Sequence, residues 1–550
     1  MGFVLLAVAV LTPKHFFRSL LILLGFLLIC LLLVQTSVVQ TWLAGRASSR
    51  LSESLHTRVS VKHVDFSFFS KMQMEGVYVE DLNKDTLLYA GKIKVNITDW
   101  FFMRDSAVLQ YIGLEDATIH LQRTDSAWNY QFLVDYFSGP TDTSKKAGID
   151  LRLQKIELKN IHLLKKDGWR GEDMGLYLAS LNVDAREINL KKKLVDINEL
   201  AIVEPIFSIY NYEGRRTYKP PPAFRDPNDT SLVWNTAGWK IMATTVSIKD
   251  GAFKDEKKSD RAAYYYFDGQ HIQFTDINAS FKNLTWVKDT ISALTILSTK
   301  ERSGFEIKSF KANMKWQPRA MEFNSLDIQT NKSHLTNYFV MKYNNFDDMG
   351  DFVKKVNMQG NFKNALIHSD DIAYFAPELG KWKKEIFITG ALHGTVADLN
   401  GKGVVIRAGN NTTLNGDISL KGLPDIDKTL INFKSNDFRT TYADVLTVVP
   451  KLKDVYEPRL DRLQFIHFRG NFTGYIRDFV TKGTVETGLG IVEADVNMKF
   501  PHGAKPTYTG KVSSAGFNLG SLVDYDNLGN IAFNVGVKGS SFALSDIQAK

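Results

Sequence analysis

One long apolar segment near the start of the chain constrains its architecture more than any other feature. Ser19 to Val39 contains no charged residue. As a helix, this segment is about 30 Å long, which matches the hydrocarbon thickness of a bilayer. No later stretch of the chain is apolar enough to span a bilayer. We therefore expect residues 16–40 to form one transmembrane signal-anchor, with the bulk of the chain on one side of the membrane.

The anchor has an alternative reading as a cleaved signal peptide. Its apolar core is long for that role, and Trp42 to Gly45 makes a poor cleavage site. Residues 1–15 form either a cytoplasmic flank or a misassigned leader, because Lys14 to Arg18 has the look of a natural signal-anchor start. The shorter flank of such an anchor is normally cytoplasmic, which places the remainder outside the cytoplasm.

Composition excludes several classes of partner. Hydrophobic residues make up 44% of the 550 residues, enough to form a sizeable core. The formal net charge of +8 is spread thinly and no block is dense in Lys or Arg, so we expect no nucleic-acid partner. The only cysteine, Cys30, lies inside the apolar segment. No disulfide or thiolate metal site can therefore form in the part beyond it.

Beyond the anchor the spacing of apolar residues changes first to that of an amphipathic helix and then to that of β-strands. Thr36 to Leu55 is expected to continue as an amphipathic helix, whose apolar points are Val39, Trp42, Leu43, Leu51 and Leu55. Residues 41–58 are the connecting segment that this helix supplies beyond the anchor. From Val59 onward the period is two, which predicts strands with one buried face.

A finer pattern suggests that these strands are bent. Two alternating apolar pairs are separated by two residues, and a β-bulge at that step keeps both pairs on one face. Stacked strands that bend at matching places form a trough with an apolar inner surface; two short strands joined by a tight turn give the same pattern. The strict copies are Ile112–Ile119, Leu151–Leu158, Ile272–Ala279, Phe305–Ala312 and Met321–Ile328, and looser ones are Met72–Val79, Leu176–Val183 and Val195–Ile202.

Few segments interrupt the strand pattern. Helices are expected from Ser369 to Ala376, with Ser369 as the N-cap, and from Thr440 to Tyr456. The proline-rich segment Lys219–Asp229 is the best candidate for a boundary between residues 59–218 and residues 219–550. Strands with a central glycine (Gly360, Gly470 and Gly510), each followed by a turn or short helix, suggest a solenoid-like repeat.

No catalytic constellation is present. His120, His162 and His271 each lie in strand-like sequence without a spaced partner, and the acidic pairs read as turn and cap residues. We therefore expect neither an enzyme nor a cofactor or metal site.

A set of segments, beginning with the N-terminal anchor and covering nearly the whole chain, is characteristic as a group. These segments are Val61–Phe66, Met72–Leu82, Leu87–Ala90, Ser126–Leu133, Ser369–Leu379, Gly422–Ile426, Gly470–Gly474, Asp478–Phe479 and Thr487–Gly490. Together they resemble AsmA-like proteins, in particular the TamB (translocation and assembly module) branch as found in Bacteroidetes-type bacteria.

This resemblance implies a fold and a function. The fold is a mainly β, elongated, half-open β-taco with one N-terminal transmembrane helix and a few short helices. The implied role is to carry phospholipids through a hydrophobic groove from the inner membrane towards the outer membrane, supporting outer-membrane biogenesis, with the bulk of the chain in the periplasm. The candidate groove lining is Ile93, Val95, Ile97, Ile119, Leu121, Leu151, Leu153, Phe274, Phe305, Ile307 and Phe323.

An alternative function is a scaffold that assembles outer-membrane β-barrel proteins by strand addition at exposed sheet edges. The resemblance implies an outer-membrane BamA/TamA-type barrel as the partner for that role. The C-terminal domain that meets this barrel is not recognisable before Lys550, so we expect the sequence to be the N-terminal portion of a longer protein.

Overall fold

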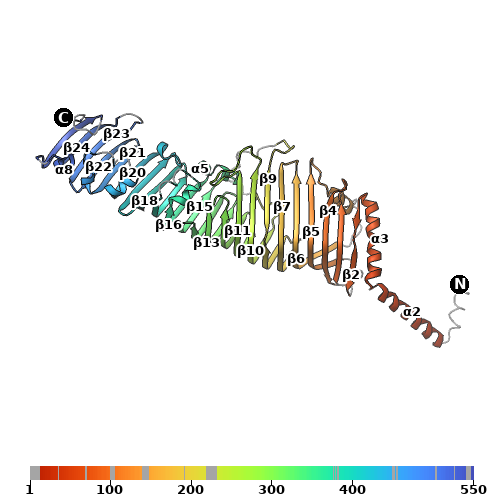
Figure 1. Ribbon diagram of the computed structural model, residues 1–550. Coiled ribbons are helices and arrows are strands. Elements are labelled where there is room, and N and C mark those ends of the chain that lie inside the picture. The colour runs from red at the N-terminus through yellow and green to blue at the C-terminus, as the bar shows by residue number, and fades with distance from the viewer. Residues whose placement is uncertain are drawn as a thin grey trace. The chain divides into compact units, whose positions relative to one another are not determined.

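The computed structural model shows a mainly β protein (Figure 1). The chain forms two compact units. Unit 1 comprises Met1–Thr230, Gly238–Ala262 and Gln270–Asn278; unit 2 comprises Ser231–Ala237, Ala263–Gly269 and Ala279–Lys550. The structure describes residues 13–34, 36–67, 71–98, 106–138, 148–190, 192–217, 232–375, 377, 380, 383–448, 453, 456, 458–501, 505–525, 527–540 and 547–549. The predicted boundary Lys219–Asp229 lies outside these residues.

Two helices precede the strands. Helix α2 (Pro13–Val34) carries large apolar side chains that are more than half exposed, for example Ile22 and Phe26. Among the side chains that the structure describes, no helix meets the length and apolarity needed to cross a membrane. Helix α3 (Ser37–Leu55) agrees closely with the predicted connecting helix. However, Trp42 and Leu43, expected on its apolar side, are exposed, whereas Gln40 is buried.

Unit 1 is built on a mixed sheet. Strands β1 and β2 both pair with β3 and share one edge, after which β3, β4 and β5 follow as antiparallel neighbours. Strand β6 is parallel to β5, which requires a crossover, and helix α4 (Gln131–Ser138) lies in it. Strand β7 is antiparallel to β6 and pairs with β8 and β9 end to end, and β10 runs parallel to both. The strands are β1 (Val59–Ser60), β2 (His63–Ser67), β3 (Lys71–Glu80), β4 (Thr86–Thr98), β5 (Ser106–Arg123), β6 (Gly148–Asp167), β7 (Glu172–Asn189), β8 (Leu194–Val203), β9 (Ile206–Asn211) and β10 (Lys240–Lys257).

Strand β11 (His271–Val287) contributes residues to both units. Within unit 2, β12 to β26 pair in sequence order as an antiparallel meander. These strands are β12 (Thr290–Glu301), β13 (Glu306–Gln317), β14 (Ala320–Thr330), β15 (His334–Lys342), β16 (Asn357–His368), β17 (Glu385–Thr395), β18 (Asp398–Ala408), β19 (Thr412–Lys421), β20 (Leu430–Thr441), β21 (Phe465–Tyr475), β22 (Asp478–Thr487), β23 (Gly490–Lys499), β24 (Thr507–Asn518), β25 (Asn530–Gly539) and β26 (Ile547–Ala549).

Short helices punctuate this meander. From β16 onward, a helix directly follows every fourth strand: α6 (Ser369–Ala373) after β16, α7 (Tyr442–Val448) after β20 and α8 (Leu519–Val523) after β24. The remaining short helices are η2 (Phe346–Asp351), α5 (Phe352–Lys355), η4 (Ile426–Lys428) and η6 (Leu460–Leu463).

The repeat and the helices agree with the sequence-based expectations in part. Gly360 and Gly510 lie in β16 and β24, equivalent strands of the repeat, but Gly470 lies in β21, which no helix follows directly. The N-cap of α6 is His368 and not Ser369, because the His368 ring accepts a hydrogen bond from the Asp370 N–H. Helix α7 begins at Tyr442, two residues later than expected, and most of the predicted part after Val448 lies outside the described residues.

The predicted bulges are present at several of the two-residue steps. In β3 and β5, Gly76 (φ 61°) and Asp116 (φ 52°) occupy the left-handed region at the step. In β14, Ser325 (φ 51°) does the same, and the register with β15 shifts between Asn324 and Leu326. A single left-handed residue shifts the alternation by one position, so the apolar pairs on both sides of the two-residue step point to the same face.

Candidate functional site

The apolar face of the unit 1 sheet is the first candidate site. Val77, Ala90, Ala117, Ile161 and Leu178 form a buried cluster that crosses β3 to β7, one residue from each strand. The partly buried residues that pack against it are Val61, Met74, Ile93, Leu114, Leu158, Leu176 and Leu181. Each strand therefore contributes apolar side chains to one common face.

The bulges explain why one strand contributes twice to this face. On β5, Leu114 and Ala117 both belong to the cluster although three positions separate them, because Asp116 between them is left-handed. Its neighbour across the strand pair, Asn160 on β6, is left-handed as well (φ 52°) and donates a hydrogen bond of 2.7 Å to the Asp116 carboxylate. The sequence reading missed the matching step on β6, although Asn tolerates this conformation better than most residues.

The predicted lining residues of unit 1 lie in these strands. Ile93 packs against the cluster. Val95 follows it two positions on in β4 and also borders the depression described below. Ile119 and Leu121 follow Ala117 at the same period in β5, and both are partly buried. Leu153 lies in β6 and is partly buried, whereas the side chains of Ile97 and Leu151 lie outside the described residues.

The predicted residues further along are not brought into that cluster. Phe274 lies in β11, partly buried, and Ile307 lies in β13 beside a register shift. Phe323 in β14 makes an edge-on contact with Phe310, with ring centroids 5.5 Å apart. Phe305 precedes β13 and packs against Tyr374 and Phe375, just beyond α6.

Unit 2 has an apolar cluster of its own. Phe362, Ala365, Ile388 and Val404 are buried across β16, β17 and β18. Partly buried neighbours pack against them: Leu335, Phe339, Ile367, Ile386, Leu392 and Ile406. None of these residues was singled out from the sequence, because continuous alternation in every strand gives no signal for which positions meet.

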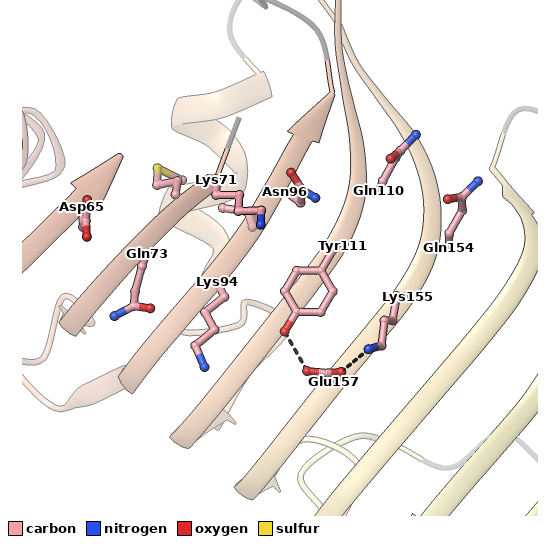
Figure 2. Close-up of a pocket in the computed structure, with 12 residues that line it drawn as sticks. Asp65, Lys71, Gln73, Lys94, Asn96, Gln110, Tyr111, Gln154, Lys155 and Glu157 are labelled. Carbon is pink, nitrogen blue, oxygen red and sulfur yellow. Dashed lines mark hydrogen bonds and ion pairs between the residues drawn. The ribbon is translucent and has the colours of Figure 1, made fainter. Parts of the chain in front are cut away.

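The opposite, polar face of unit 1 contains a depression of about 570 Å³ over β2 to β6 (Figure 2). At its centre, the Tyr111 hydroxyl donates to Glu157 Oε2 at 2.8 Å, and Lys155 Nζ lies 2.6 Å from the same carboxylate. Burial, together with the neighbouring Glu157, raises the pKa of Tyr111 to about 12, so its hydroxyl stays protonated and donates. Hydrogen bonds from Lys155 and Tyr111 hold the pKa of Glu157 below its ordinary value.

The charges in this depression are largely compensated. Lys94 Nζ lies 2.6 Å from Glu115, as Lys155 does from Glu157. Tyr111 extends over Gly113, where a Cβ atom would lie 2.7 Å from the Tyr111 hydroxyl oxygen. The arrangement therefore offers hydrogen bonds from a largely neutral surface.

Two of the three histidines singled out from the sequence, His162 and His271, have a ring or carboxylate partner. His162 packs on Tyr177 with ring centroids 4.7 Å apart, and His271 Nδ1 lies 2.7 Å from Glu256. No group of three or more His, Cys, Asp or Glu side chains able to hold a metal ion occurs among the described residues.

The segment Ser126–Leu133, which carries part of the family resemblance, fastens the ends of two strands. Arg123 at the end of β5 makes two hydrogen bonds of 2.7 Å to Asp167 at the end of β6, and its guanidinium lies 4.4 Å from the Trp128 ring centroid. Asn129 donates to the buried Asp81 carboxylate at 3.1 Å and also bonds the backbone of Gln122. These contacts assign the segment a structural role in the fold.

Comparison with known proteins adds no family assignment. No protein-family model matches the chain, and no curated protein matches it.

Proposed function

We propose that this protein carries phospholipid acyl chains along the apolar face of its sheet, as an anchored member of the AsmA-like, TamB-type class. The observation that supports it is the apolar face of unit 1, where five strands in succession each place a buried residue in one cluster. The surrounding apolar side chains are only partly buried, so a ligand can reach them. An apolar surface of this kind needs an apolar ligand or partner to cover it in water.

The anchor and the location are part of the same proposal. Among the side chains of helix α2 that the structure describes, nine large apolar ones from Leu21 to Leu33 are exposed. Inserting them into the inner membrane, with the sheet in the periplasm, removes this surface from water. Unit 2 repeats the arrangement with its own apolar cluster, so each unit offers apolar surface by itself. We further propose that the protein acts without catalysis.

The test is lipid retention by the full chain purified in mild detergent. Native mass spectrometry and lipid extraction are expected to find phospholipid bound to the wild type. Ile119→Glu places a charge on the apolar face and should reduce the bound lipid severalfold, because an unpaired carboxylate on an apolar surface is costly. Thr118→Glu, on the neighbouring position of the same strand, points to the other face and is the matched control. Equal retention by both variants, or a lipid-free wild type, would contradict the proposal.

The alternative function, a scaffold that templates client strands, is not supported at the β1/β2 edge. Helix α3 occupies the backbone groups that a client strand would need there. We therefore do not propose that edge as a template in the state described.

A further inference from the structure

Helix α3 substitutes for a strand along the β1/β2 edge of unit 1. The Gln40 side-chain amide donates to the Phe66 carbonyl at 3.1 Å and accepts from the Phe66 N–H at 2.5 Å. The Thr41 hydroxyl lies 3.2 Å from the Val64 N and 3.3 Å from its carbonyl oxygen. The Ser52 hydroxyl contacts the same pair of groups on Val59, at 2.8 and 2.9 Å.

Helix α3 covers the backbone N–H and C=O groups to which a further strand would bond at this edge of the sheet. Val64 and Phe66 are two residues apart, so their backbone N–H and C=O groups point to the same side of β2. The residue between them, Asp65, is in register with Gln73 on the other side, within the β2/β3 pair. An edge with these groups free is a template for another strand.

The spacing of the two covered β2 residues is self-complementary. Two copies of β2 can pair antiparallel about a two-fold axis through Asp65, so that Val64 of each copy faces Phe66 of the other. The N–H and C=O groups of Val64 and Phe66 on both copies are then all hydrogen-bonded. The same register places the Asp65 carboxylates of the two copies directly opposite each other, and like charges in that position oppose pairing. Asp65 is exposed on the monomer.

We propose that the β1/β2 edge is a latent self-pairing surface, and that α3 and Asp65 together keep it closed. The partner that it accepts when α3 is displaced is the same edge of a second copy of this chain. The Thr36 hydroxyl, just before α3, donates to the Leu33 carbonyl of α2, so α2 is the element whose displacement we expect to release α3 from this edge. The inference goes beyond lipid carriage and does not depend on it.

The experiment compares full-chain variants in detergent by native mass spectrometry and light scattering over a range of concentrations. Gln40→Ala, Thr41→Val and Ser52→Ala together remove the edge contacts with little change in side-chain volume at Thr41 and Ser52. We expect the wild type to be monomeric and this triple variant to dimerise as concentration rises. Ser49→Ala is the matched control, because the Ser49 hydroxyl bonds only its own helix at Gly45 and is exposed.

Two further measurements make the result specific to this edge. Adding Asp65→Asn to the triple variant should tighten dimerisation about two- to fivefold, since one like-charge pair is removed. Amide exchange in residues 58–67 should be slow in the wild type, fast in the dilute triple variant and slow again in its dimer. A triple variant that stays monomeric overturns the proposal, whether its edge amides exchange quickly or remain protected. A dimer whose affinity is indifferent to Asp65 overturns it as well.

Discussion

The Arg123–Asp167 pair gives the sharpest quantitative prediction for stability. The Asp167 side chain is fully buried and that of Arg123 is 12% exposed. The carboxylate accepts two hydrogen bonds of 2.7 Å from the guanidinium and one of 3.0 Å from the Arg170 N–H. Asp167→Asn leaves the guanidinium of Arg123 buried beside Trp128 without its counter-charge.

The size of the effect follows from burial. Removing one partner of a buried ion pair typically costs about 3–5 kcal/mol, because the other charge stays desolvated. Replacing both partners, as in Arg123→Met with Asp167→Leu, should cost less than Asp167→Asn alone, since no uncompensated charge remains.

The same pair predicts how stability depends on pH. Burial by itself raises the pKa of Asp167, but the hydrogen bonds from Arg123 and Arg170 and the charges of Arg123 and Lys165 outweigh it, so the pKa lies below its ordinary value. A depressed pKa in the folded state stabilises the fold at pH values above the unfolded pKa of about 3.9. This contribution is lost as the pH falls through the lower, folded pKa.

Urea unfolding followed by tryptophan fluorescence, at pH 7 and near pH 3, tests both points. The wild type should lose stability on acidification by more than Asp167→Asn does, since the variant lacks the titrating group. An Asp167→Asn variant within about 1 kcal/mol of the wild type at pH 7, with the same pH dependence, would refute the reasoning.

Three further predictions concern other parts of unit 1. Asp116→Val should destabilise the protein by about 1–2 kcal/mol in thermal unfolding, because a β-branched residue disfavours φ 52°, whereas Asp116→Gly should cost less; equal losses would contradict the bulge argument. Asn129→Asp should lower the melting temperature more than Asn129→Ala, because it sets a second carboxylate 3.1 Å from that of Asp81; the reverse order would count against the assigned contact. Glu157→Gln should move the pKa of Tyr111 from about 12 towards 10. A tyrosinate absorbance titration measures this pKa, with Tyr111→Phe subtracted to remove the signal of the other tyrosines. An unchanged pKa would show that burial alone raises it.

The mainly β class and the bulged strands were predictable from the sequence because both follow from local rules. Alternation at a period of two marks strands, and a two-residue step with Gly, Asp or Ser at its second position marks a bulge, as Gly76, Asp116 and Ser325 show. The pairing was less predictable. The parallel β5–β6 and β8–β10 pairs depend on crossovers, which leave no periodic signal in the strands themselves.

The candidate site was predictable as a type of surface and not as a set of contacts. Ile93 was identified correctly as part of the apolar face, but its buried partners Ala90 and Ala117 are small residues with weak hydrophobic signals. The role of α3 was missed for a physical reason. An edge strand requires donors and acceptors, so the side of the helix that packs carries Gln40, Thr41 and Ser52 instead of the apolar points Trp42 and Leu43.

Site-specific photo-crosslinking tests the central claim, that lipid occupies the apolar face, most directly. A photoreactive phenylalanine analogue replaces Ile119 or Thr118 in the full chain within its native membrane, and covalent adducts are identified by mass spectrometry. The account predicts phospholipid adducts at position 119 and few at position 118. Equal labelling at the two positions, or adducts at 119 that are exclusively protein, would contradict it.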